Sequence, residues 1–502
     1  MKLYLNRLLI RISARVPRKL WTITQTHRLK GEIISLPLFS TMLNTLLASL
    51  RHPAEIEALL KYKFSPPNTN FNRNKKIIAN NPTKKKCYDF LFLTSRSFAA
   101  VIAELDDELR DAVCLFYLIL RGLDTIEDDM TLPLPRKTEL LRSFHKIIYQ
   151  RGWNFDESEY TLLFWVGHGV IARGFNRVTH GLLLSHVPTT STTPTTDGPN
   201  EKDRVLLVDY QVVIDEFLAL KPAFQTVIAD IAHKMGDGMA DYANGEHRVN
   251  TAIEKISDFD LYCHYVAGLV GYGLSDLFAV SGLESAEVAN SKKISNSMGQ
   301  FLQKTNIIRD YLEDLVDGRQ FWPREIWANY VEDFADLSKP GFEVKAQACL
   351  SAMVLNVLEH VPDCLVYLSQ LRNQSVFNFC AIPQVMAIAT LALVFNNLEV
   401  YRRNVKIRKG EAVRLILAST NMGNVVAIFR YYLYDISGKN DPLDPNFMKI
   451  SIAIGKIEQW IETNMPQTNV VAKPYSAAAS SSHLLLLAIL AGVFGVLYSR
   501  LQ

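Results

Sequence analysis

Helical periodicity over long stretches is the feature that most restricts how this chain can fold. Residues 97–128, SFAAVIAELDDELRDAVCLFYLILRGLDTIED, carry apolar side chains three and four positions apart and contain no Pro. This spacing is typical of a helix with one buried face. The same pattern recurs in 206–245, 258–282, 291–316, 345–372, 376–404 and 410–435. Because no stretch shows repeated Val, Ile and Thr alternation between hairpin turns, the sequence predicts an all-α protein.

Two segments interrupt the helical pattern. Residues 70–86, NFNRNKKIIANNPTKKK, are basic and rich in turn formers, and we expect a loop there. Residues 179–203 have a Thr- and Pro-rich centre of low complexity, which predicts disorder. We assign residues 42–470 to one helical domain that continues on both sides of these segments.

The N-terminal 41 residues differ from the helical domain in composition. Residues 1–41 have arginines about four apart among Leu and Ile, and Glu32 is their only acid. Such a pattern is typical of an amphipathic transit-like helix. The alternative is an extension upstream of a true start at Met42, where a good helical pattern begins, and we favour this second interpretation.

The C-terminal end predicts a membrane anchor. Residues 471–482 are a linker rich in small residues, and an uncharged apolar run follows from Leu484 to Tyr498. A bilayer span needs about 20 residues, so this shorter run is also compatible with a buried core helix. A thin bilayer such as that of the endoplasmic reticulum tolerates a short span. We therefore expect a transmembrane tail anchor over 483–499.

Composition excludes some classes of function. The formal charge of +3 is too small to favour nucleic acid as a partner. The six cysteines are scattered without a CxxC pair, and the eleven histidines form no HExxH pattern. A reduced body that faces the cytosol, without a structural zinc site, is therefore the simplest interpretation.

Two acidic motifs of the same form stand far apart in the chain. In DTIED, Asp124, Glu127 and Asp128 occupy positions i, i+3 and i+4, which share one face of a helix. DYLED repeats this spacing with three further carboxylates, Asp310, Glu313 and Asp314. Carboxylates this close repel one another, so they need cations beside them. Mg²⁺ prefers such oxygen ligands, above all where a diphosphate completes its coordination.

Arginines accompany both motifs. Arg121 lies one turn before the first motif, Arg309 directly precedes the second, and Arg319 follows it. Guanidinium groups bind phosphate oxygens through two parallel hydrogen bonds. Most single acidic sets are solvated helix faces, but two sets on apolar helices, each with arginines, indicate a metal-dependent pocket for a prenyl diphosphate.

The two acidic motifs belong to a longer series of sequence strings, and the order of these strings along the chain matches that of a known enzyme family. The strings are LTSRSFAAVI (93–102), FYLILRGLDTIEDDMTLP (116–133), YCHYVAGLVGYGLSDLF (262–278), SMGQFLQKTNIIRDYLED (297–314), GRQFWPREIW (318–327), FNFCAIPQVMAIATLA (377–392) and VKIRKGEAV (405–413). From about Met42 to about residue 440 the chain resembles the squalene synthase family of farnesyl-diphosphate farnesyltransferases, in its fungal form. Residues 164–200 depart from the family, as either a lineage-specific loop or translated non-coding sequence.

The resemblance implies an isoprenoid-synthase helical bundle whose two acidic motifs face each other across a central cavity. It also implies a reaction in two steps. Two farnesyl diphosphates first condense to presqualene diphosphate, which then ionises, rearranges and accepts hydride from NADPH to give squalene. The family further implies a monomer anchored in the endoplasmic reticulum membrane, with its catalytic domain in the cytosol.

The resemblance also implies roles for particular residues. Tyr262 is expected to be the catalytic tyrosine, beside Asp124, Asp128, Asp310 and Asp314 and the cavity phenylalanines Phe98 and Phe379. The expected NADPH contacts are Arg96, Arg121, Arg309, Lys406 and Arg408, although no GxGxxG motif indicates a nicotinamide site. The expected substrate contacts are Ser95, Tyr117, Arg121, Arg309, Arg319, Val270, Leu274, Gln303, Asn306, Cys380 and Pro383.

Two alternatives for the function remain at this stage. Phytoene synthase shares the fold and the first half-reaction, but uses geranylgeranyl diphosphate and no NADPH. The strings FCAIPQVMA and VKIRKG and the apolar tail argue against it. A non-catalytic, membrane-anchored helical scaffold is the alternative from another class, and it predicts decay of the acidic motifs, which are intact.

Overall fold

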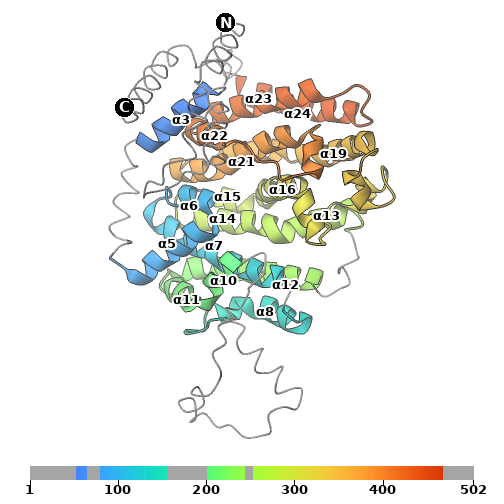
Figure 1. The fold of residues 1–502 in the computed structure, drawn as a ribbon. Coiled ribbons are helices and arrows are strands. Elements are labelled where there is room, and N and C mark those ends of the chain that lie inside the picture. Colours follow the sequence, from blue (N-terminus) through green and yellow to red (C-terminus); the bar gives the residue numbers. More distant parts are fainter. Residues whose placement is uncertain are drawn as a thin grey trace, which may run out of the picture.

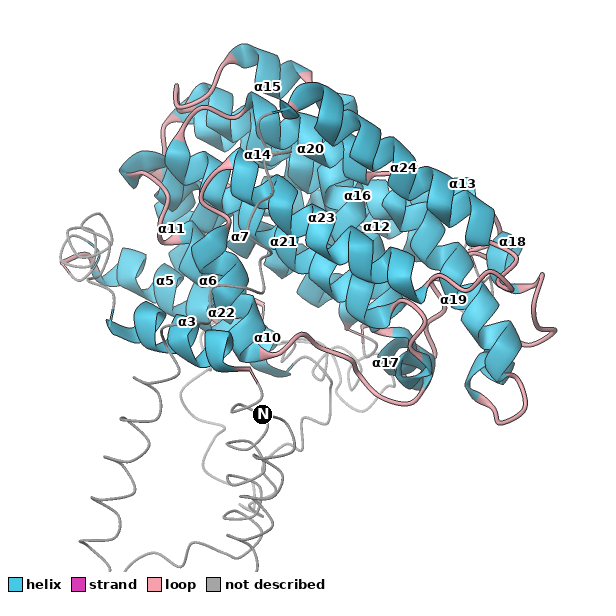
Figure 2. Cartoon of the chain, turned by 90° about the horizontal axis from the view of Figure 1, so that it is seen from above, coloured by secondary structure: helices cyan, strands magenta, loops and turns pink. Residues whose placement is uncertain are grey.

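A computed structural model describes residues 52–64, 78, 80–129, 132–155, 201–243 and 253–466. Helices make up the regular structure of these residues, and no strand occurs among them (Figure 2). The all-α prediction is therefore confirmed. The predictions for 1–41, 164–200, 471–482 and 483–499 lie outside the described residues.

The helices are stacked in layers, with α8 and α12 at one end and α23 and α24 at the other (Figure 1). The helices before residue 250 are α3 (Pro53–Phe64), α5 (Pro82–Thr94), α6 (Arg96–Ile102), α7 (Asp107–Asp128), α8 (Leu134–Ile147), α10 (Glu201–Val208), α11 (Gln211–Leu218) and α12 (Pro222–Ala243). The middle of the chain forms α13 (Ile256–Cys263), η3 (His264–Gly268), α14 (Leu269–Val280), α15 (Ala286–Asn290), α16 (Lys292–Arg309), α17 (Tyr311–Val316) and α18 (Arg324–Trp327). The last part forms η4 (Phe334–Ser338), α19 (Glu343–Leu358), α20 (Val361–Gln370), α21 (Gln374–Val394), η5 (Leu398–Tyr401), α22 (Lys409–Ala418), α23 (Met422–Lys439) and α24 (Phe447–Asn464).

Local sequence signals account for several helix starts. Helix α5 begins with Pro82 after Asn81, whose side chain accepts a hydrogen bond from the backbone N–H of Lys84. The last residues of the expected loop 70–86 therefore belong to a helix, which corrects that prediction. Helix α21 starts in the same way, because the Asn373 side chain accepts from two backbone N–H groups of the first turn.

Most of the long helices expected from the periodicity are broken into two or three pieces. The stretch 97–128 is divided between α6 and α7, and Asp106 at the break has an extended backbone. Contacts from α21 replace the lost helical bonds there, because the Asp106 carboxylate accepts from Asn373 and its N–H donates to the Ser375 hydroxyl. Similarly, α16 ends at Arg309 and α17 begins at Tyr311.

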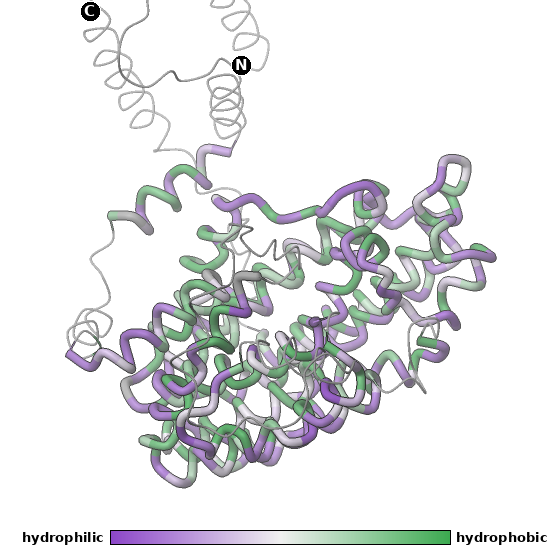
Figure 3. Tube along the Cα trace, turned by 60° about the horizontal axis from the view of Figure 1, so that its bottom comes forward, coloured by the Kyte–Doolittle hydropathy of each residue, from purple (hydrophilic) through white to green (hydrophobic). Residues whose placement is uncertain are grey.

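The core lies between α7, α12, α14, α16 and α21. Helix α16 packs against α14, α20 and α21, and α12 packs against α7, α8 and α14. Apolar and polar stretches alternate along the helices, as expected where each helix buries one face (Figure 3). Gly299 allows a close approach of two backbones, since a Cβ atom there would lie 2.2 Å from the carbonyl oxygen of Ala267.

Three apolar stretches of the described chain could cross a membrane by length and composition: Ile256–Val280, Glu343–Gln370 and Gln374–Val394. The last of these is α21, and 78% of its most apolar window is buried inside the protein. Within this bundle the stretches supply core helices, but the core also includes residues outside the predicted helical stretches, such as Phe144, Trp322 and Ile457.

Candidate active site

An apolar cavity of about 310 Å³ lies between α6, α7, α14, α16 and α21. Most of the residues expected to contact substrate line it: Tyr117, Arg121, Val270, Leu274, Gln303, Asn306, Cys380 and Pro383. The two expected cavity phenylalanines, Phe98 and Phe379, line it as well. Asp124 of the first acidic motif also lines it, whereas Phe278 and Tyr367 form a part that is fully enclosed. The cavity therefore runs from a charged mouth to a buried apolar interior.

The first acidic motif forms the last turn of α7, as its spacing predicts. Arg121 lies one turn earlier, with its Nη1 atom 3.6 Å from the Asp124 carboxylate, and it donates to the Tyr117 hydroxyl. Burial raises the pKa of Asp124 to about 6, against the opposing effect of Arg121. Burial, together with the charges of Asp128 and Asp124, raises the pKa of Glu127 to about 8. These carboxylates lack sufficient positive charge around them.

The second acidic motif is built differently from the first. Asp310 caps the end of α16, and Glu313 and Asp314 lie in the first turn of α17. The expectation of one continuous helical face is therefore wrong for this motif, although the Asp314 N–H still donates to the Asp310 carbonyl. Asn404 donates to the side chains of Asp310 and Glu313. Burial raises the pKa of Asp314 to about 7, despite the nearby Arg319.

Arg319 connects the two motifs across the site. Its Nη1 atom lies 3.1 Å from Asp128 of the first motif, and its Nη2 atom lies 3.1 Å from Asp314 of the second. The same nitrogen lies 3.2 Å from Asp317. One guanidinium group therefore spans the distance between the motifs, which face each other as the family resemblance implied.

The carboxylates of the two motifs suit divalent cations whose coordination shell is completed by a bound substrate. Raised pKa values at Asp124, Glu127 and Asp314 mark unmet negative charge on both sides of Arg319. Within the described ranges, no three His, Cys, Asp or Glu side chains converge into a ready metal cage. Mg²⁺ is commonly held in this way, by one or two carboxylates with water and substrate phosphate as its other ligands.

Tyr262 lies beside the acidic motifs rather than in the wall of the apolar cavity. It is the next-to-last residue of α13, and η3, a π-helical turn, follows directly. Such turns often occur at functional sites. Its ring stacks on Phe321 with centroids 5.0 Å apart, and the Arg319 guanidinium lies over the same Phe321 ring. Burial, with the charges of Glu127, Asp128 and Asp314, raises the pKa of Tyr262 well above its ordinary value, so the phenol is neutral.

The basic residues expected to contact NADPH are distributed over two places. Arg121 and Arg309 flank the acidic motifs, and Arg309 forms an ion pair with Asp310. Lys406 is exposed and follows Asn404, which contacts the second motif. Arg408 donates to the Glu55 carboxylate of α3 through two nitrogens, 2.8 and 2.6 Å away. The side chain of Arg96 is outside the described part of the structure.

Two further expected residues lie at the cavity edge. Ser95 caps α6 and accepts from the Phe98 N–H, and it does not line the cavity. Phe98 lines the cavity and stacks on Tyr117, yet 40% of its side chain is exposed. Phe98 therefore belongs to the mouth of the cavity.

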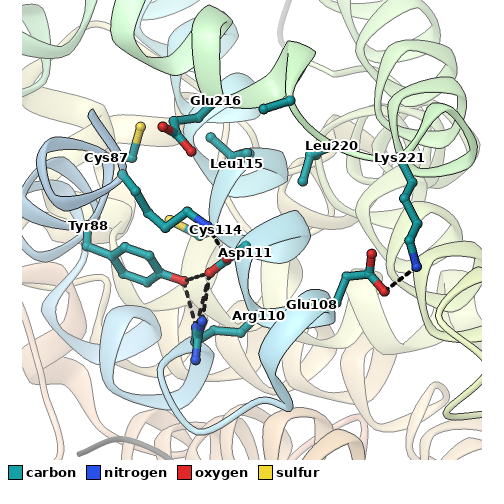
Figure 4. Close-up of a pocket in the computed structure, with 12 residues that line it drawn as sticks. Cys87, Tyr88, Glu108, Arg110, Asp111, Cys114, Leu115, Glu216, Leu220 and Lys221 are labelled. Atoms are coloured by element: carbon teal, nitrogen blue, oxygen red, sulfur yellow. Dashed lines mark hydrogen bonds and ion pairs between the residues drawn. The ribbon is translucent and has the colours of Figure 1, made fainter. Parts of the chain in front are cut away.

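A second, polar cavity of about 340 Å³ lies between α5, α7 and α11 (Figure 4). Asp111 accepts there from Lys84, Tyr88 and Arg110, and Lys221 pairs with Glu108. Its charged groups are thus largely bound to each other, and neither acidic motif reaches it. We interpret this cluster as a brace that holds the start of α7.

Several contacts of the site have no local sequence signal. Asp129, which directly follows the first motif, accepts from Arg204, and its side chain is largely buried. Asp203 lies 4.0 Å from Arg121, and Asn404 and Phe321 contact the second motif and Tyr262. Only tertiary folding brings these residues to the motifs.

Comparisons with known proteins agree with the site. Residues 93–411 match the family model for squalene/phytoene synthase. Squalene synthase of Schizosaccharomyces pombe is 50% identical over 414 residues, covering 82% of this chain and 81% of that protein. Squalene synthase ERG9 of Saccharomyces cerevisiae is 46% identical, covering 82% and 83%. A solved structure of TcSQS with the ligand BPH1237 matches at TM-score 0.65 and 39% identity, covering 76% of this chain and 99% of that one. The chain belongs to the squalene/phytoene synthase family.

Proposed function

We propose that the chain is a squalene synthase that condenses two farnesyl diphosphates head to head and reduces the product to squalene. The main support is that Arg319 contacts both acidic motifs, and that these motifs lie beside one apolar cavity. The names of the curated relatives favour this activity over phytoene synthesis. The intact acidic motifs and the cavity argue against a non-catalytic scaffold.

The charged end of the site serves the diphosphates. Mg²⁺ bound there would neutralise diphosphate and make it a better leaving group. Asp124, Glu127 and Asp128 on one side, and the acids of the second motif on the other, would supply its oxygen ligands. The guanidinium groups of Arg121, Arg309 and Arg319 bind phosphate oxygens of the substrate.

The apolar end of the site serves the prenyl chains and the carbocation. Val270, Leu274 and Phe379 exclude water from the reacting carbons, and aromatic faces stabilise positive charge. Tyr262 lies next to the acidic motifs, where its neutral hydroxyl can donate a hydrogen bond or a proton to the leaving diphosphate.

The reductant of the second step is NADPH, which supplies hydride. Lys406 is the basic residue best placed to meet its phosphates from the side of the second motif, two residues after Asn404. Arg408 joins it after leaving Glu55, and Arg121 and Arg309 complete the set with Arg96. This assignment is supported by the family resemblance and by the position of the 404–408 segment.

The setting of the enzyme follows from its sequence and its product. The catalytic domain spans 42–470, and the apolar segment 483–499 holds it at the endoplasmic reticulum membrane on the cytosolic side. Squalene is a hydrocarbon, so its release beside a bilayer is favourable. The family resemblance supports a monomer.

Incubation of the protein with labelled farnesyl diphosphate and Mg²⁺ tests the function. We expect presqualene diphosphate without NADPH and squalene with it. Phytoene from geranylgeranyl diphosphate, without squalene from the shorter substrate, would refute the proposal. In a second experiment, Asp128→Asn and Asp314→Asn are each expected to lose most turnover, and full turnover of either variant at saturating Mg²⁺ contradicts the metal assignment.

A further inference from the structure

A hydrogen-bond acceptor is left over in the buried part of the apolar cavity. Gln384 of α21 lines the cavity and is 1% exposed. Its Nε2 atom donates to the backbone carbonyl of Met298, 3.0 Å away. Its Oε1 atom is buried and has no hydrogen-bond partner among the described residues. Leaving a buried carbonyl without a donor costs about 1–3 kcal/mol, so a ligand is the expected partner of this oxygen.

The neighbouring hydroxyl groups cannot supply the missing donor. Ser275 donates to the Gly271 carbonyl, so the Tyr367 hydroxyl, 2.7 Å from it, gives its proton to Ser275. Ser295 donates to the Lys292 carbonyl. These three hydroxyls, of which those of Ser295 and Tyr367 belong to the cavity lining, are thus bound within the protein, and Gln384 presents an acceptor to the cavity.

Proline in α21 leaves a backbone carbonyl of the same helix without its usual donor. Pro383 lies inside the helix, one residue before Gln384, and has no N–H to donate to the carbonyl of Phe379 four residues earlier. Both Phe379 and Pro383 line the cavity, and the Phe379 ring meets Phe278 edge to face, with ring centroids 6.1 Å apart. The Gln384 side chain and these aromatic rings therefore line the same cavity.

This surrounding suits a positive charge. An anion beside Gln384 would meet the negative end of its side-chain carbonyl dipole. A neutral prenyl chain fits the apolar walls but leaves the Gln384 oxygen without a partner, whereas a carbocation gains from both the carbonyl dipole and the ring faces. Asp124, the acidic side chain that lines the cavity, belongs to its charged mouth.

We propose that Gln384 binds the carbocation of the second half-reaction, holding the positive carbon in the buried part of the cavity away from the departed diphosphate. The inference rests on the proposed function, because it assumes that such a cation forms in this cavity. It assigns Gln384 as a cation-binding residue and gives the Phe379 carbonyl, freed by Pro383, a supporting part.

A pair of ligands of equal shape tests the proposal without turnover. One is a tertiary amine with two prenyl chains, protonated at neutral pH, and the other has a C–H group in place of the N–H⁺. Each is titrated with Mg²⁺ and inorganic diphosphate into the full-length protein and its Gln384→Met and Gln384→Glu variants. The measured quantity is the ratio of the two dissociation constants.

We expect the preference for the amine to fall at least tenfold in Gln384→Met, which keeps the length of the side chain but has no carbonyl. Gln384→Glu keeps acceptor oxygens and loses the bond to Met298, so it is expected to retain or increase the preference. In turnover assays, Gln384→Met should lower the ratio of squalene to presqualene diphosphate.

An unchanged ratio of dissociation constants in Gln384→Met would overturn the proposal. An equal loss of the preference for the amine in both variants would also overturn it, because Gln384 would then have only a structural role. Thermal unfolding checks that each variant is folded, and the Glu variant alone decides the question if the Met variant is not. Failure of the proposed function is a separate result, since wild-type protein would then make no squalene from farnesyl diphosphate.

Discussion

Replacing Arg319 with Gln removes the cation that joins the two acidic motifs. Its nitrogens lie 3.1 Å from both Asp128 and Asp314. Two unit charges about 4 Å apart attract by about 4 kcal/mol at an effective dielectric constant of about 20, and by about 1 kcal/mol in water. The Arg319 side chain is 37% exposed and Asp128 is 34% exposed, so solvent screens that contact strongly.

The contact with Asp314 is the stronger of the two, because this carboxylate is only 13% exposed. After allowance for screening, we expect Arg319→Gln to lower the free energy of unfolding of the metal-free protein by about 2 kcal/mol. The matched control is Arg324→Gln, since Arg324 is 57% exposed and 3.6 Å from Glu254. This control is expected to cost about 0–1 kcal/mol. Urea unfolding in the presence of a chelator measures both.

Metal affinity distinguishes a bridging cation from a merely stabilising side chain. In the wild type Mg²⁺ competes with Arg319 for Asp128 and Asp314, whereas in the variant this competition is absent. Since 1.4 kcal/mol corresponds to a factor of ten, we expect Mg²⁺ alone to bind Arg319→Gln about tenfold more tightly. Inorganic diphosphate should bind more weakly, because a phosphate contact is lost. Calorimetric titration that finds Mg²⁺ affinity unchanged or reduced in Arg319→Gln refutes this reasoning.

Three further predictions concern pH, the polar brace and the cofactor segment. The pKa values of Asp124, Glu127 and Asp314 are raised in the folded chain, so these acids bind protons more strongly there than in the unfolded chain. The metal-free protein should therefore lose stability as the pH rises from about 4.5 to 8. Urea midpoints measured with and without Mg²⁺ should diverge over this range, and parallel curves would contradict the assignment. Asp111→Asn should lower the free energy of unfolding by about 3–5 kcal/mol, because the Arg110 side chain is 3% exposed and loses the charge of Asp111. The control Asp89→Asn, in an exposed ion pair, should lower it by about 0–1 kcal/mol. Equal losses of stability in thermal or urea unfolding would exclude the brace. Glu55→Gln should release Arg408 from its ion pair and make it available to NADPH. The KM for NADPH should therefore fall about twofold to fivefold, while the KM for farnesyl diphosphate stays unchanged. A higher KM for NADPH in this variant would contradict the assignment of Arg408.

The first acidic motif could be predicted from sequence because its geometry is local. Asp124, Glu127 and Asp128 lie in one regular helix, so their spacing fixes their common face. The second motif has the same spacing, yet a helix break at Asp310 changes its backbone. Nothing in the periodicity marks this break, because the apolar pattern continues across it.

Contacts between distant segments explain what the periodicity cannot predict. Arg319 follows the second motif in sequence, but Asp128 is 191 residues earlier in the chain, so their contact depends on the tertiary fold. The break at Asp106 is stabilised by Asn373 and Ser375, more than 250 residues away. The family resemblance implied the facing motifs, and the physical reason for their closeness became visible only in the folded chain.

The two motifs differ in backbone structure, and this difference could couple metal binding at the second motif to cofactor binding. The first motif is fixed at the end of a long helix whose other end is held by the polar brace around Asp111. The second motif lies at a helix junction and accepts hydrogen bonds from Asn404. Four residues after Asn404, Arg408 pairs with Glu55.

One short segment, 404–408, therefore contacts the second metal-binding motif at one end and carries the proposed cofactor contacts at the other. A diphosphate that draws Asp310 and Glu313 towards a metal also changes the partners of Asn404, and so the start of the segment that carries Lys406. Each motif pairs with one arginine of the proposed cofactor set, Arg121 with Asp124 and Arg309 with Asp310. Among the described contacts only the second motif also contacts the 404–408 segment, so we expect cofactor affinity to respond more strongly to changes at Asp310 than at Asp124. Measurement of NADPH binding to Asp310→Asn and Asp124→Asn in the absence of prenyl substrate compares the two directly, and equal effects would show that the segment does not couple them.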